Sequence, residues 1–149
     1  MVFKLHPQSE ERKRSAITVI KYLLAEKKPE VLPAHYRELL STLLWKVTEA
    51  DSRKYKTRFQ TQGALGCSDK ANLRHEHVFQ RSKMIAALEK AAPHEVDDIL
   101  KDAIGCTVTV EEHTRLSKFD EEYGWERYRK AGISVIDTQT GERANLKVH

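Results

Sequence analysis

The chain has 149 residues, of which 40% are apolar and 32% charged, so it is long enough to bury one core under a well-solvated surface. No apolar run has the length that crosses a bilayer, and the first residues lack the apolar core of a signal peptide. The two cysteines are far apart, which is typical of a reducing cytosol and excludes a local zinc knuckle built from cysteines. We therefore expect a cytoplasmic domain that does not enter a membrane.

Positive charge is concentrated in the first part of the chain. Residues 1–60 contain 13 Lys or Arg and 7 Asp or Glu, whereas residues 61–149 contain 13 and 15. Such a basic segment can bind the phosphate backbone of a nucleic acid by releasing counterions. Many soluble proteins carry a similar excess as a solvated face, and on charge alone we favour this second interpretation.

Two amphipathic helices are expected within residues 1–60. Ser9 followed by two glutamates is typical of a helix start, and apolar residues then recur on one face until Pro29. Pro33 suits the first position of the second helix. The apolar residues that follow it at spacings of three and four are Tyr36, Leu39, Leu40, Leu43, Leu44 and Val47. We expect an antiparallel pair, whose exposed apolar surface would serve equally as a homodimer interface or as a contact for a protein partner.

The segment 52–68 is basic and polar, and its pattern fits neither a strand nor a helix throughout. Lys54, Lys56 and Arg58 alternate here with aromatic residues. Basic and aromatic side chains together are typical of nucleic-acid contacts. A solvated strand or helix face explains the same pattern, and the sequence does not separate the two interpretations.

The second half of the chain predicts short strands mixed with helices. Strands are expected at 73–79, 106–108 and 133–137, and helices at 82–92 and 125–131. A further helix is expected to open at Pro93 and end at Gly105. Thr109 and Glu112, three residues apart, match a capping box at the start of another. Helices first, then short strands mixed with helices, predict an α+β fold.

The densest group of potential metal ligands and bases is His75-Glu76-His77. On a strand, His75 and His77 share one face and Glu76 points to the other, so Glu76 and His77 face one cavity only where the strand ends or bends. His113 follows the Thr109 cap by four residues, where the helix dipole favours the neutral imidazole that binds metals. A lone histidine on an amphipathic helix is otherwise a packed or solvent-facing residue. A carboxylate on a metal beside an imidazole that takes a proton from water is a workable hydrolytic pair.

Two stretches of this half resemble a divergent HNH endonuclease. They are residues 73–78 (LRHEHV) and 106–116 (CTVTVEEHTRL), and the later GWERYRKAGI at 124–133 is similar to segments that trail the motif in some small bacterial and phage members. The resemblance covers residues 73–137 at most. It implies a ββα-metal finger, in which a hairpin and a helix hold one divalent cation and cut phosphodiester bonds in nucleic acid.

The resemblance also assigns roles to individual residues. Glu76 and His113 would bind the metal, and His77 would be the general base that activates water. Arg115 or Lys118 would contact the scissile phosphate, while His75 would be a supporting group or an extra ligand. A site of one carboxylate and one imidazole accepts Mg²⁺, Mn²⁺, Ni²⁺ or Zn²⁺, so the identity of the metal stays open.

We therefore expect a metal-dependent nuclease of DNA or RNA on one domain, 1–149, with a helical, basic part at 1–60 and the HNH-like part at 73–137. A non-catalytic nucleic-acid-binding or partner-binding protein on a degenerate finger is the alternative, because Gln80 stands where members often have proline. A structural metal site is a third interpretation. Geometry separates them, since Glu76 and the two proposed histidines must converge on one cavity near basic residues.

Overall fold

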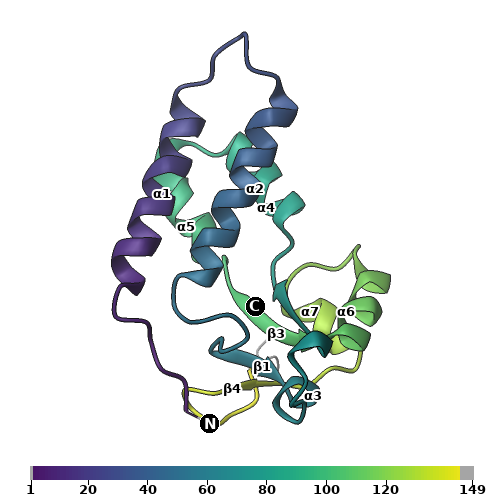
Figure 1. The fold of residues 1–149 in the computed structure, drawn as a ribbon. Helices are drawn as coiled ribbons and strands as arrows, with labels where there is room; N and C mark the ends of the chain where they lie inside the picture. Colours follow the sequence, from purple (N-terminus) through teal and green to yellow (C-terminus); the bar gives the residue numbers. More distant parts are fainter. Residues whose placement is uncertain (1, 145–149) are drawn as a thin grey trace.

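Two long antiparallel helices, α1 (Ser9–Ala25) and α2 (Pro33–Glu49), begin the fold, as the sequence predicts (Figure 1). They are seen in a computed structural model, which describes residues 2–144. Pro33 occupies the first turn of α2, where its missing N–H costs no hydrogen bond. The apolar stripes of both helices face inward, so the pair is held together mainly by burial of aliphatic side chains.

Two shorter helices from later in the chain complete this helical layer. They are α4 (Arg81–Lys90) and α5 (Val96–Leu100), which a 3₁₀ turn, η2 (Pro93–Glu95), connects. The inward residues of α4, namely Met84, Ile85 and Leu88, join the core of α1 and α2 as expected. Figure 1 shows α4 and α5 behind the long pair.

The expectation that the helix after Pro93 ends at Gly105 is wrong. The helix ends at Leu100, and Gly105 is the first residue of a strand. A Cβ at Gly105 would lie 2.6 Å from Cε1 of His75, which is closer than atoms can pack. The glycine is therefore explained by the close approach of the His75 ring and not by a helix cap.

Four short strands form one mixed sheet in the order β2-β3-β1-β4. Their bounds are Phe59–Thr61 for β1, Leu73–His77 for β2, Gly105–Thr109 for β3 and Val135–Asp137 for β4. Strands β2 and β3 are antiparallel, with His77 opposite Gly105, whereas β1 is parallel to β3 and antiparallel to β4. The sequence pattern did not predict β1, which lies in the undecided segment 52–68. The fold is α+β, as expected.

The helix α6 (Val110–Leu116) follows β3 directly and starts with the predicted capping box. The Thr109 hydroxyl accepts a hydrogen bond from the N–H of Glu112 at 3.1 Å, and the Glu112 carboxylate accepts one from the N–H of Thr109 at 2.9 Å. The Thr61 hydroxyl also donates to Glu112, at 2.6 Å, and connects the cap to the end of β1. Because α6 packs on β2 and β3, its position relative to the end of β2 is fixed.

A second core lies between the sheet and the C-terminal helix α7 (Trp125–Lys130). Tyr128 is completely buried there, and the Trp125 ring packs edge-on against Phe59 and Tyr128. These aromatic side chains therefore attach α7 to the sheet. The remaining short elements are α3 (Gln62–Leu65), η1 (Lys70–Asn72) and η3 (Ser117–Phe119).

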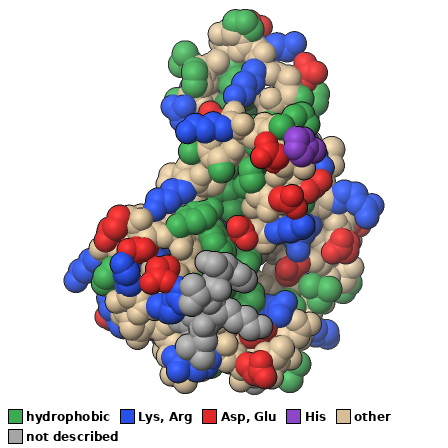
Figure 2. All heavy atoms as spheres, turned by 180° about the vertical axis from the view of Figure 1, so that it is seen from behind, with side chains coloured by type: hydrophobic (Ala, Val, Ile, Leu, Met, Phe, Trp, Pro, Cys, Tyr) green, Lys and Arg blue, Asp and Glu red, His purple; other side chains and the backbone are tan. Residues whose placement is uncertain are grey.

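The surface of the described chain carries both signs of charge. Figure 2 shows Lys or Arg and Asp or Glu side chains interspersed over one face, so the basic excess of residues 1–60 forms no continuous basic surface on that face. Between residues 2 and 144, no helix is both long enough and apolar enough to cross a membrane.

Candidate active site

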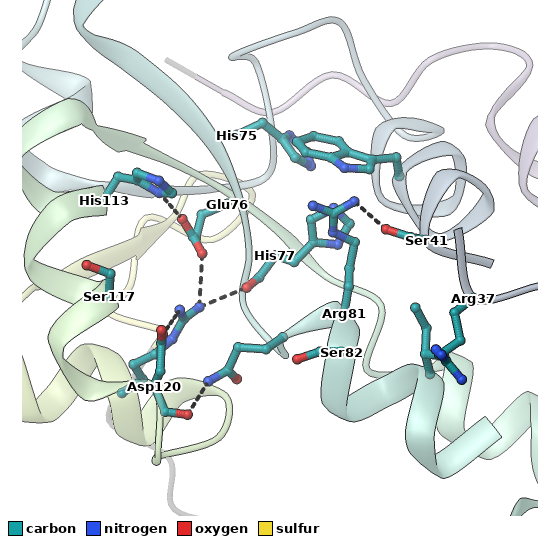
Figure 3. A pocket seen from close by; sticks show the side chains of 14 residues that line it. Arg37, Ser41, His75, Glu76, His77, Arg81, Ser82, His113, Ser117 and Asp120 are labelled. Atoms are coloured by element: carbon teal, nitrogen blue, oxygen red, sulfur yellow. Dashed lines mark hydrogen bonds and ion pairs between the residues drawn. The ribbon is translucent and has the colours of Figure 1, made fainter. Parts of the chain in front are cut away.

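A cavity of about 550 Å³ lies where the end of β2 meets α2, α4 and α6 (Figure 3). This volume is within the range of roughly 300 to 1,000 Å³ that is usual for ligand sites. Glu76, His77 and His113, which the sequence singled out, all line it, as does His75. The fold therefore brings these four residues to one place, although 37 positions separate Glu76 from His113.

Glu76 and His113 are in direct contact across the cavity wall. Nδ1 of His113 lies 2.5 Å from Oε2 of Glu76, and the two side chains come from β2 and α6. The Glu76 side chain is only 12% exposed, whereas that of His113 is 52% exposed. The pair thus has one fixed, largely buried partner and one partner that solvent or a ligand reaches.

Arg127 holds the other oxygen of Glu76. Its side chain is 3% exposed and donates to Oε1 of Glu76 at 3.1 Å and to the carbonyl oxygen of His77 at 2.9 Å. An ion pair of 3.7 Å also joins it to Asp120. The sequence did not predict this positioning role of Arg127, because no local pattern indicates which strand end an arginine reaches.

His75 and His77 lie on the opposite face of β2, as strand alternation predicts. Both rings contact Trp45 of α2, with ring centroids 4.9 Å away for His75 and 4.6 Å away for His77. Nε2 of His75 is 3.0 Å from the Thr48 hydroxyl. Because β2 ends at His77, both of its faces open to the same cavity, and Glu76 and His77 line it together. Trp45 is half-buried and forms part of the cavity wall.

Both histidines on this face are held in the neutral form. Burial, with the neighbouring charges of Lys54 and Arg81, lowers the pKa of His75 to about 4. Burial, with the charges of His75, Arg81 and Arg127, lowers the pKa of His77 to about 3. Nε2 of His77 is buried and has no hydrogen-bond partner among the described residues. Each ring therefore presents an unprotonated nitrogen at neutral pH.

Arginine side chains line the cavity opposite the Glu76–His113 pair. The Arg81 guanidinium lies over the Trp45 ring, 4.9 Å from its centroid, and donates to the Ser41 hydroxyl at 2.7 Å. Arg37 reaches the same side from α2. The cavity thus has acidic and basic sides, and the basic residues are not those that the sequence indicated.

Arg115 and Lys118, the expected phosphate contacts, do not line the cavity. The guanidinium of Arg115 pairs with Glu111 at 2.8 Å and donates to the Ala131 carbonyl at 2.9 Å. Lys118 lies on η3 and not on α6. Among the arginines that do line the cavity are Arg37 and Arg81.

The basic residues Lys54, Lys56 and Arg58 differ in their surroundings. Arg58 donates two hydrogen bonds to Asp137, at 2.8 and 2.7 Å, and is thereby tied to the end of β4. Lys54 lies over the Tyr55 ring, 5.1 Å from its centroid. Each of the three residues borders a different cavity, and the three cavities adjoin one another at Ser52. Of these cavities, only the one beside Lys54 also includes a site residue, His75.

Comparison with family models, curated proteins and solved structures gives no match for this chain. Its function is therefore inferred from the geometry of the cavity.

Proposed function

We propose that the protein is a metal-dependent nuclease that hydrolyses phosphodiester bonds of DNA or RNA in this cavity. The observation that carries the proposal is the contact between Glu76 and His113, at 2.5 Å, in a cavity that His77 also lines. A carboxylate and an imidazole in contact, with guanidinium groups opposite, suit a substrate that brings phosphate to a cation.

The order of elements supports the same proposal. Strands β2 and β3 are antiparallel, and α6 follows β3 and packs on both, which is the order of a ββα finger. Helices α4 and α5 are inserted between the two strands. In this proposal the finger is the β2–β3–α6 unit, with Glu76 at the end of its first strand and His113 on its helix.

The donor atoms of the protein would supply only part of the coordination of a divalent cation. Glu76 and His113 supply one carboxylate oxygen and one imidazole nitrogen, and Arg127 already occupies the other Glu76 oxygen. Within residues 2–144, no group of three or more His, Cys, Asp or Glu side chains is arranged to hold a metal. A closed structural zinc site uses four ligands, so a cation held by this donor set would take its other ligands from water and phosphate.

The bound cation would neutralise charge that develops on the phosphate. The chain's own residues provide the remaining chemistry. Arg127 fixes Glu76 in one orientation, and His77, neutral in the free protein, accepts a proton from water at its unprotonated nitrogen. A pKa of about 3 makes His77 a weak base. The negative charge of a bound phosphate would raise that pKa, because an opposite charge favours the imidazolium.

The same burial of His77 favours a second candidate, a non-catalytic nucleic-acid-binding protein on a degenerate finger. Nε2 of His77 is inaccessible to solvent in this conformation. If it stays so when substrate binds, water cannot reach that nitrogen, and the cavity binds phosphate without cleaving it.

A nuclease assay with a panel of metals separates the two candidates. Plasmid DNA and a structured RNA are incubated with wild type, His77→Ala, Glu76→Gln or His113→Ala in Mg²⁺, Mn²⁺, Ni²⁺ or Zn²⁺. His94→Ala is the matched control, since His94 is exposed and does not line the cavity.

We expect wild type and His94→Ala to cleave equally and His77→Ala to be slower by roughly 100-fold or more. Cleavage by His77→Ala at the wild-type rate would refute the role of His77 as base. A wild type that binds nucleic acid but cleaves neither substrate with any metal supports the non-catalytic candidate.

A further inference from the structure

Four polar side chains form the side of the cavity that faces the Glu76–His113 pair (Figure 3). Arg37 and Ser41 come from α2, and Arg81 and Ser82 from the first turn of α4. We name this side the α2–α4 wall. None of these residues belongs to the β2–β3–α6 unit.

The two arginines of the α2–α4 wall have no ion pair with a carboxylate in the described part of the chain. Arg81 is half-buried, and its contacts with Trp45 and Ser41 hold it in one orientation. The hydrogen bond to Ser41 uses one of the five N–H donors of Arg81, so other donors remain for a ligand. A guanidinium that is already oriented loses little freedom when it binds an oxyanion. Arg37 is exposed beside it and adds a second positive charge.

The start of α4 adds further donors to this wall. No side chain caps the N-terminus of α4, a helix of ten residues, so its first N–H groups have no side-chain acceptor. Uncapped N–H groups at the positive end of a helix favour an anion. Ser82, in this first turn, carries a hydroxyl group that lines the cavity.

His77 provides an independent sign of a ligand position next to Arg81. It is 7% exposed and lines the cavity, yet its buried Nε2 has no hydrogen-bond partner among residues 2–144. Buried polar side-chain atoms are normally hydrogen-bonded. The His77 ring packs against Trp45, over which the Arg81 guanidinium also lies. Donors without acceptors on the wall and a buried polar atom without a partner on β2 therefore lie at the same cavity.

We infer that the α2–α4 wall binds a backbone phosphate of the nucleic-acid strand, adjacent to the phosphate that is cleaved at the Glu76–His113 pair. The identity of the ligand as a nucleic-acid strand rests on the proposed function. A strand carries a phosphate at every nucleotide, so one that crosses the cavity brings one phosphate to each side. The N-terminal helices, through Arg37, thus become part of the substrate-binding surface.

Binding in the absence of metal tests the inference without requiring cleavage. A short fluorescein-labelled single-stranded oligonucleotide, DNA or RNA, is titrated with protein in EDTA, and anisotropy is followed at several salt concentrations. The variants are Arg37→Gln and Arg81→Gln. Arg14→Gln is the matched control, because Arg14 is an exposed arginine on α1 that does not line the cavity.

We expect Arg81→Gln to weaken binding roughly tenfold and Arg37→Gln roughly threefold. Each should lower the slope of log affinity against log salt by about 0.7, the value for one phosphate contact on a single strand. Arg14→Gln should bind as wild type does. Because Arg81 is half-buried, thermal melts check the fold, and exposed Arg37 carries the test if Arg81→Gln unfolds.

Three results are decisive. Affinities of both cavity variants equal to that of Arg14→Gln overturn the inference. The inference is also overturned if Arg37→Gln binds the oligonucleotide as tightly as wild type does but changes the strength with which inorganic phosphate or a mononucleotide competes with it. That result favours a small phosphate ligand. If wild type binds the strand through these arginines but cleaves no nucleic acid, the inference about the α2–α4 wall stands and only the proposed nuclease activity is refuted.

Discussion

Replacing His77 by phenylalanine should make the protein less sensitive to mild acid. The buried His77 ring stays neutral in the folded protein because its pKa is lowered from 6.5 to about 3. In the unfolded chain the same ring takes up a proton as the pH falls through about 6.5. Between these two values the unfolded state holds one proton more than the folded state, so the free energy of unfolding falls as the pH falls.

The size of the effect follows from proton linkage. One proton bound only by the unfolded state lowers the free energy of unfolding by about 1.4 kcal/mol per pH unit. From about pH 6.5 to about pH 4.5, wild type should therefore lose roughly 2 to 3 kcal/mol through His77. Phenylalanine keeps an aromatic ring against Trp45 and has no proton to bind. His75, whose pKa is lowered to about 4, contributes the same kind of dependence to both proteins.

Urea denaturation followed by circular dichroism measures the difference. Wild type, His77→Phe and the exposed-histidine control His94→Ala are unfolded between about pH 7 and about pH 4.5, in EDTA to exclude metal binding. The free energies of wild type and His77→Phe should diverge by about 1.4 kcal/mol per pH unit, while His94→Ala follows wild type. Parallel curves for wild type and His77→Phe would show that the folded protein binds a proton at His77 as readily as the unfolded chain.

Two further substitutions test the packing around the site. Arg127→Met should destabilise the fold by roughly 3 to 5 kcal/mol, because Glu76 and the His77 carbonyl lose a buried donor. Arg127→Lys should cost less. Thermal denaturation measures the stability of both variants, and an Arg127→Met variant as stable as wild type contradicts the prediction. Gly105→Ala should cost roughly 1 to 3 kcal/mol, because its Cβ would lie 2.6 Å from the His75 ring. The matched control is Gly66→Ala, whose Cβ would lie 3.6 Å from its nearest atom. A Gly105→Ala variant as stable as this control would mean that the His75 ring moves freely.

Local features of the sequence were sufficient to predict most of the helices. The apolar stripe that follows Pro33, and the pairing of Thr109 with Glu112, each depend on residues within a few positions of one another. The same holds for the alternation along β2, which placed His75 and His77 on one face. The resemblance implied that Glu76 and His113 bind one metal, and the structure brings the two side chains into contact, while their binding of a metal stays a prediction.

Features that depend on distant residues could not be predicted from the sequence. Strand β1 has three residues and is held by β3 and β4, which lie far along the chain. Gly105 looked like a helix cap, since nothing nearby shows that the His75 ring needs the space. Arg58 looked free to bind nucleic acid, and only the fold reveals its partner Asp137, 79 positions away. The position of Trp45 in the cavity wall likewise depends on its packing against β2, which lies later in the chain.

Because Arg127 lies near the end of the chain, the site is completed only late in synthesis. Helices α1 and α2 leave the ribosome first and can pack together early. Glu76 has no buried guanidinium to hold it until α7 has been made, and the sheet lacks an edge strand until β4 follows. A nascent chain that ends before residue 127 therefore carries the cavity residues 37 to 113 without the arginine that fixes their carboxylate. Premature termination shortly before residue 127 should release a protein with its first helices formed and its site incomplete.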